Sequence, residues 1–83
     1  MTVDLKTPIT MKDLMPGLNY LIGAEWRIDP NLTEDYLANK INDLLLRLNV
    51  DQELSGKIEQ NVRHFVREFR KGNFKIDWLH PPI

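Results

Sequence analysis

The apolar positions in the C-terminal half of the chain recur at helical spacing in two successive segments. In residues 34–48 they fall at i, i+4, i+7, i+8 and i+11, and the set is Leu37, Ile41, Leu44, Leu45 and Leu48. In residues 52–71 the set is Leu54, Ile58, Val62, Phe65, Val66 and Phe69. Because this spacing keeps the apolar side chains on one side of a 3.6-residue helix, the pattern predicts two amphipathic helices that bury these stripes together.

An earlier segment, residues 11–26, also has helical spacing, with one face made of Met11, Leu14, Met15, Leu18, Leu21, Ile22 and Trp26. Pro16 falls within it and lacks an amide hydrogen, so we expect a kink or a fresh helix start there. A strand over residues 20–28 is an open alternative, because apolar and polar residues also alternate in that stretch.

Helix-end signals support these boundaries. Thr10 followed by Asp13, then Thr33, then Asp51 stand where N-caps are expected, because their side-chain oxygens can accept hydrogen bonds from the first free amides of a helix. Gly72 follows the third segment and suits the left-handed conformation that commonly ends a helix.

The two ends of the chain lack helical spacing. Residues 1–10 predict an extended arm, and residues 73–83 predict an extended tail with one apolar side. The tail has two interpretations: it covers the open end of its own helical core, or it binds a groove on a partner through Trp78 and Leu79. A two-stranded ribbon between the tail and Val3 and Leu5 of the arm is a further expectation.

The composition fits one small globular domain. With 83 residues, of which 42% are hydrophobic and 28% charged, the chain has material for a single core. We therefore predict an all-α domain of three helices, at about 11–26, 34–48 and 52–71, with extended arms. The absence of cysteine excludes disulfides and thiolate metal sites. No signal peptide or long apolar run is present, so we expect a cytoplasmic protein that does not bind membranes.

Charge is separated along the chain although the net charge is only −1. Residues 29–53 hold six acidic and two basic residues, whereas residues 57–75 hold six basic and two acidic residues. Such a hairpin of acidic and basic helices can attract an oppositely charged protein, or pair with a second copy of itself.

Arg63, Arg67 and Arg70, called here the arginine stripe, lie opposite the apolar face of the third helix and are expected to face solvent. A row of cations suits binding to phosphates, so a nucleic-acid-binding regulator is the alternative function. Against it, acidic residues occupy the start of this helix, and Glu59 is spaced to form an ion pair with Arg63.

The sequence offers little for catalysis. His64 and His80 are the only histidines, and neither has a nucleophile at a recognisable spacing. Two separated histidines without cysteine do not predict a metal site, and the scattered glycines do not form a phosphate-binding loop. We therefore expect no enzyme activity, no cofactor and no metal.

These observations favour a non-enzymatic interaction protein, such as an adaptor, an inhibitor or a regulatory subunit. Leu46 points about 180° away from Leu37, among asparagines, so it is either an ordinary exposed leucine or the centre of a second contact surface. The partner is expected to be another protein or a second copy in a homodimer. The predicted partner-binding residues are Leu46, Arg63, Arg67, Arg70, Trp78 and Leu79.

Overall fold

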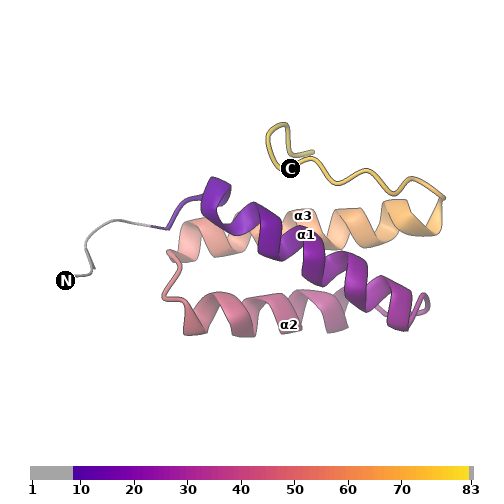
Figure 1. The fold of residues 1–83 in the computed structure, drawn as a ribbon, viewed down its shortest axis with the longest axis horizontal. Helices are drawn as coiled ribbons and strands as arrows, with labels where there is room; N and C mark the ends of the chain where they lie inside the picture. Colours follow the sequence, from indigo (N-terminus) through magenta and orange to yellow (C-terminus); the bar gives the residue numbers. More distant parts are fainter. Residues whose placement is uncertain (1–8, 83) are drawn as a thin grey trace.

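Three helices and a returning tail make up the fold. A computed structural model describes residues 9–82, with α1 at Met11–Ile28, α2 at Glu34–Arg47 and α3 at Gln52–Arg70. The helices pack as a bundle, and the tail turns back toward the N-terminal end of α3 (Figure 1). Residues 20–28 belong to α1, so the strand alternative is wrong. Within residues 9–82 the tail forms no strand, and the ribbon residues Val3 and Leu5 lie outside the described part.

The start of α1 is fixed by two hydrogen bonds from Thr10 to Asp13. The backbone amide and the hydroxyl of Thr10 both donate to the Asp13 carboxylate, each at 3.0 Å. The backbone amide of Thr10 contributes most to holding the pKa of Asp13 below its ordinary value, and the hydroxyl adds to it. The helix then runs through Pro16 without a break, so the expected fresh start there is wrong. Proline denies a hydrogen bond only to the carbonyl of Lys12, and the apolar face on both sides of it is held by the core.

The predicted caps of the other two helices are confirmed. The Thr33 hydroxyl accepts a hydrogen bond from the Tyr36 amide at 3.1 Å. The Asp51 carboxylate accepts from the amides of Glu53 and Leu54 at 3.1 and 3.3 Å. Each cap gives a partner to amides that the first turn of a helix leaves free.

Both α2 and α3 end in a Schellman motif. Gly72 has a φ of +91°, its amide donates to the Phe69 carbonyl, and the next amide, of Asn73, donates to the Glu68 carbonyl. At the end of α2 the same role falls to Asn49, with a φ of +56°. The glycine was predicted from the sequence. The asparagine was not, because it looked like an ordinary part of a short connection.

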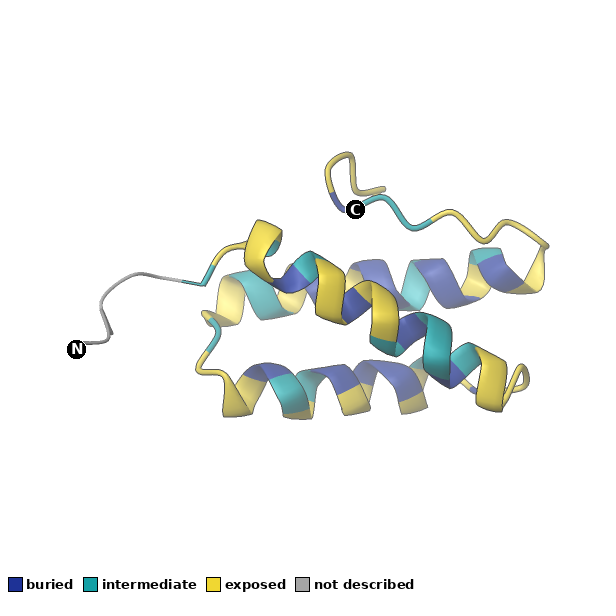
Figure 2. Cartoon of the chain, viewed as in Figure 1, coloured by how far each residue is buried: buried dark blue, intermediate teal, exposed yellow. Residues whose placement is uncertain are grey.

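The core lies where the three apolar faces meet, as the buried segments in Figure 2 show. It confirms the two predicted stripes with three corrections. Leu48 is 42% exposed, because it caps α2 where the chain turns away. Leu44 and Leu54 are only partly buried, at the margins of their stripes. The buried residues that form the hydrophobic core cluster are Leu14, Leu18, Ile22, Leu32, Leu37, Ile41, Leu45, Ile58, Val62, Phe65, Val66, Phe69 and Trp78.

The tail covers the core on the side of α1 and α3. Trp78 is only 4% exposed, and its indole N–H donates to Asn19 Oδ1 of α1 at 2.7 Å. Its ring meets Phe65 of α3 edge to face, with 5.0 Å between the ring centroids. The interpretation of the tail as a cover for its own core is therefore confirmed. In residues 9–82 no helix combines the length and the apolar character needed to cross a membrane.

Candidate functional site

The arginine stripe is bound to the first turn of α2 and to the residue just before its N-cap. Arg67 donates from Nε and Nη2 to the two carboxylate oxygens of Glu34, both at 2.7 Å. Arg63 donates to Asp35, and Arg70 donates to the carbonyl oxygen of Leu32 at 2.5 Å. Arg67 and Arg70 are exposed, as the sequence predicts, whereas Arg63 is half-buried. The acceptors that these three guanidinium groups bind were not predicted. Because α2 and α3 are antiparallel, the second half of α3 lies beside the acidic start of α2.

These contacts shift the pKa values of Glu34, Arg63 and Arg67. The hydrogen bonds from Arg67 hold the pKa of Glu34 below its ordinary value. The same pair raises the pKa of Arg67, and Asp35 raises that of Arg63. Acidic residues at the start of α2 thus pair with basic residues of α3 within one chain, and these pairs stabilise the packing of α2 on α3.

Asn42 and Glu59 form the next contact along the same seam. The Asn42 side-chain amide donates to the Glu59 carboxylate. Glu59 was expected to pair with Arg63 one turn later on α3, but its hydrogen bond comes from across the seam, while Arg63 binds Asp35. A row of polar contacts therefore joins α2 to α3 from Leu32 as far as Asn42.

Beyond Asn42 the seam opens into a groove at the turn between the two helices. This α2–α3 groove has a volume of about 550 Å³. Its apolar lining comes from Leu46 and Val50, and Leu46 is 76% exposed. The remaining lining residues are Asn42, Asn49, Gln52, Ser55, Gly56 and Glu59.

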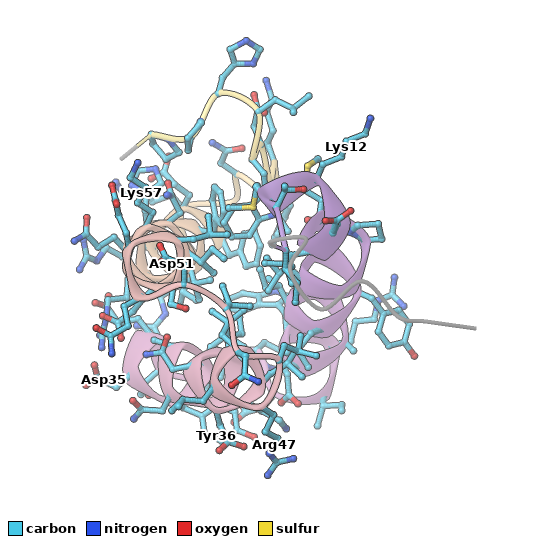
Figure 3. The ribbon with its side chains drawn as sticks, turned by 90° about the vertical axis from the view of Figure 1, so that its left-hand side faces the viewer. Lys12, Asp35, Tyr36, Arg47, Asp51 and Lys57 are labelled. Atoms are coloured by element: carbon cyan, nitrogen blue, oxygen red, sulfur yellow. The ribbon has the colours of Figure 1, made fainter. Side chains whose placement is uncertain are left out.

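The seam faces away from α1. Figure 3 looks along the helices from the turn between α2 and α3, and Asp35 lies on the side of α2 opposite α1. On the other side of α2, Lys40 and Tyr36 donate hydrogen bonds to Glu25 of α1. One face of α2 is thus fastened to α1, and the face that carries Leu46 is left uncovered.

The tail forms a second, smaller hollow against α3, of about 180 Å³, lined in part by His64 and His80. The Asp77 carboxylate accepts from the backbone amides of His80 and Leu79, both at 3.0 Å. The hydrogen bond from the His80 amide contributes most to lowering the pKa of Asp77, and that from the Leu79 amide adds to it. Within residues 9–82 no group of three or more histidine, aspartate or glutamate side chains is placed to hold a metal ion.

The six predicted partner-binding residues therefore lie in two regions. Leu46 lines the groove at one end of the α2–α3 seam, and the arginine stripe binds at the other end of the seam. Trp78 of the tail is buried against α1 and α3, and Leu79 beside it is 72% exposed. A partner reaches Trp78 only by displacing the tail. The sequence analysis did not predict that polar residues of α3, such as Gln52 and Ser55, line a groove with Leu46. Placing α2 and α3 antiparallel and side by side would have indicated it.

Comparison of the chain with protein-family models, with curated proteins and with solved structures found no match.

Proposed function

We propose that this protein is a non-enzymatic protein–protein interaction module that receives an apolar side chain of its partner in the α2–α3 groove. The observation that carries the proposal is the exposure of Leu46 at the edge of a groove. An exposed leucine alone is ordinary, but a leucine next to an apolar hollow offers a partner both a side chain to cover and a place to fill.

The chemistry of the groove supports binding rather than catalysis. Its polar lining is mainly uncharged, and its one titratable side chain, Glu59, already binds Asn42. Both histidines lie by the tail instead. Amide and hydroxyl groups beside the apolar side chains of Leu46 and Val50 suit the backbone and apolar side chains of another protein. An adaptor, an inhibitor or a regulatory subunit in the cytoplasm is the role we propose, and the cysteine-free composition fits that compartment.

Nucleic-acid binding stays a prediction that no observation on residues 9–82 favours. That prediction relies on the arginine stripe to bind phosphates, but each of these arginines donates to an acceptor on residues 32–35. Binding to phosphates would have to compete with those acceptors. If it occurs, the affinity will fall steeply as salt rises.

The chain lacks cysteine, so one introduced thiol gives a unique probe of the groove. Ser55→Cys carries a photoreactive cross-linker into the groove, and Lys12→Cys carries it on α1 as a matched control. In native extract, we expect a protein adduct from the Ser55 position that resists high salt and disappears when Leu46→Glu is added. The captured protein is then purified, and Leu46→Ala should weaken its binding by about tenfold or more, because one buried leucine contributes about 1.5–3 kcal/mol.

Equal adducts from both positions, or adducts that survive Leu46→Glu, would contradict the proposed function. A salt-sensitive adduct with nucleic acid would favour the alternative function instead.

A further inference from the structure

We infer that the protein in the α2–α3 groove is a second copy of this chain. The inference rests on the proposed function and identifies its partner. Two copies pair about a two-fold axis parallel to the helices, so that α2 of each lies on α3 of the other. Each Leu46 then enters the groove of the other copy over Gly56.

The register of the seam places these two residues at the same level. Asn42 of α2 bonds Glu59 of α3, and the two helices are antiparallel. Four residues further along α2 is Leu46, and four residues back along α3 is Ser55, with Gly56 adjacent to it. Leu46 and Gly56 both line the groove, so one surface carries a projecting side chain beside a position that has none. A two-fold axis along the seam brings Leu46 of each copy into contact with Gly56 of the other copy.

Gly56 has no role within a single chain that requires glycine. A Cβ atom at this position would meet no atom within 4 Å, and Gly72 is the only described glycine with a positive φ. Glycine inside a helix costs about 1 kcal/mol relative to alanine. A close approach of another chain gives a physical reason for that cost. A Cβ atom at Gly17 or Gly23 of α1 would likewise meet no atom within 4 Å, and Gly17, which does not line the groove, serves as a control.

The polar chemistry of the groove is suited to pairing with itself. The side chains of Asn49, Gln52 and Ser55 both donate and accept hydrogen bonds, so each finds a complementary group on an identical surface. Near the groove, the charges of Arg47 and Asp43 are already paired with each other within one chain, at 3.0 Å. With a net charge of −1, two copies repel each other little.

A stable dimer would need to cover only a small part of the exposed surface of the chain. A stable interface takes about 800 Å² from each partner. The described chain exposes 6068 Å², so the side of α2 and α3 that α1 leaves uncovered needs to supply only roughly an eighth of it. For a chain this short, covering part of that surface adds stability that a single small core lacks.

Sedimentation equilibrium of the full chain over a range of concentrations tests the inference. We expect the unmodified protein to form dimers, and both Leu46→Glu and Gly56→Gln to be monomeric. Gly56→Gln should also have a higher melting temperature than the unmodified monomer. The substitution replaces a glycine inside a helix, and a Cβ atom at this position meets no atom of the same chain within 4 Å. Gly17→Gln on α1 should remain dimeric, which excludes a general effect of replacing helical glycine.

A protein that stays monomeric up to its solubility limit, or a dimer that persists in Leu46→Glu or Gly56→Gln, would overturn the inference. The proposed function would survive that result if the cross-linked protein from extract still depends on Leu46. If that dependence is also lost, both fail.

Discussion

Arg67 and Glu34 are joined by two parallel hydrogen bonds of 2.7 Å, one to each carboxylate oxygen. They stand 33 positions apart in the sequence, on α3 and in the first turn of α2. The two-point geometry fixes both the spacing and the register of these helices. Basic residues that resemble a ligand-binding stripe in the sequence therefore serve the fold first.

We predict that Glu34→Gln and Arg67→Gln each lower the melting temperature by a few degrees. The double variant should lose little more than Glu34→Gln alone, because each substitution removes the Arg67–Glu34 pair and only Glu34→Gln also removes the contact of 3.6 Å with Arg63. Thermal unfolding at low and high salt measures these melting temperatures. High salt should reduce the differences in melting temperature between the variants and the unmodified protein, because it screens the ion pair. Arg47→Gln is the control, since its pair with Asp43 lies within one helix and is highly exposed. Fully additive losses would show that Glu34 and Arg67 act independently.

Acid should destabilise the protein through the same carboxylate. Since folding lowers the pKa of Glu34, its stabilising effect is complete above the ordinary glutamate pKa and is lost as the pH falls through the lowered value. The pKa of Glu68 is lowered too, mainly by Lys71, and contributes with the same sign. We expect the urea midpoint to fall between neutral pH and about pH 3. The decline should be shallower in Glu34→Gln, and identical curves would argue against this contribution.

Trp78→Ala should cost about 3 kcal/mol, since it empties a buried aromatic site against Phe65. Trp78→Phe should cost about 1 kcal/mol, because it keeps most of the packing but loses the hydrogen bond to Asn19. Leu79→Ala, at an exposed neighbouring position, should change little. Urea unfolding measures all three variants. A Trp78→Ala variant as stable as Leu79→Ala would mean that the tail does not hold to the core in solution.

The two left-handed residues give opposite predictions for substitution. Gly72→Ala should lower the free energy of unfolding by about 1 kcal/mol, because a side chain is strained at that φ. Asn49→Gly should leave it unchanged or raise it slightly, whereas Asn49→Val should lower it by about 1–2 kcal/mol. Denaturant titration at low protein concentration separates these effects from any association. Equal stabilities of Asn49→Gly and Asn49→Val would contradict the assigned conformation.

The helices were predictable because their signals are local. The spacing of Ile58, Val62 and Phe65 defines the buried face of α3 by itself, and Asp51 marks its start within four residues. The fresh helix start expected at Pro16 is wrong, because a single missing hydrogen bond weighs less than the packing of the apolar face around it.

The partners of the arginine stripe were not predictable in the same way. They depend on the register between α2 and α3, which periodicity within one helix does not contain. For the same reason the exposure of Leu46 followed from the sequence but the groove beside it did not. The burial of Trp78 was one of two interpretations, because alternation shows that one side of the tail is apolar without showing what covers it.

An isotope-filtered NOE experiment on a mixture of ¹³C-labelled and unlabelled full-length chains tests the central claim most directly. The paired grooves predict NOEs between the Leu46 methyl groups of one copy and the Gly56 α-protons of the other. They also predict that these NOEs vanish in Leu46→Ala. Intermolecular NOEs confined to other exposed apolar residues, such as Tyr20 or Leu79, or no intermolecular NOE at concentrations where sedimentation shows a dimer, would contradict the account.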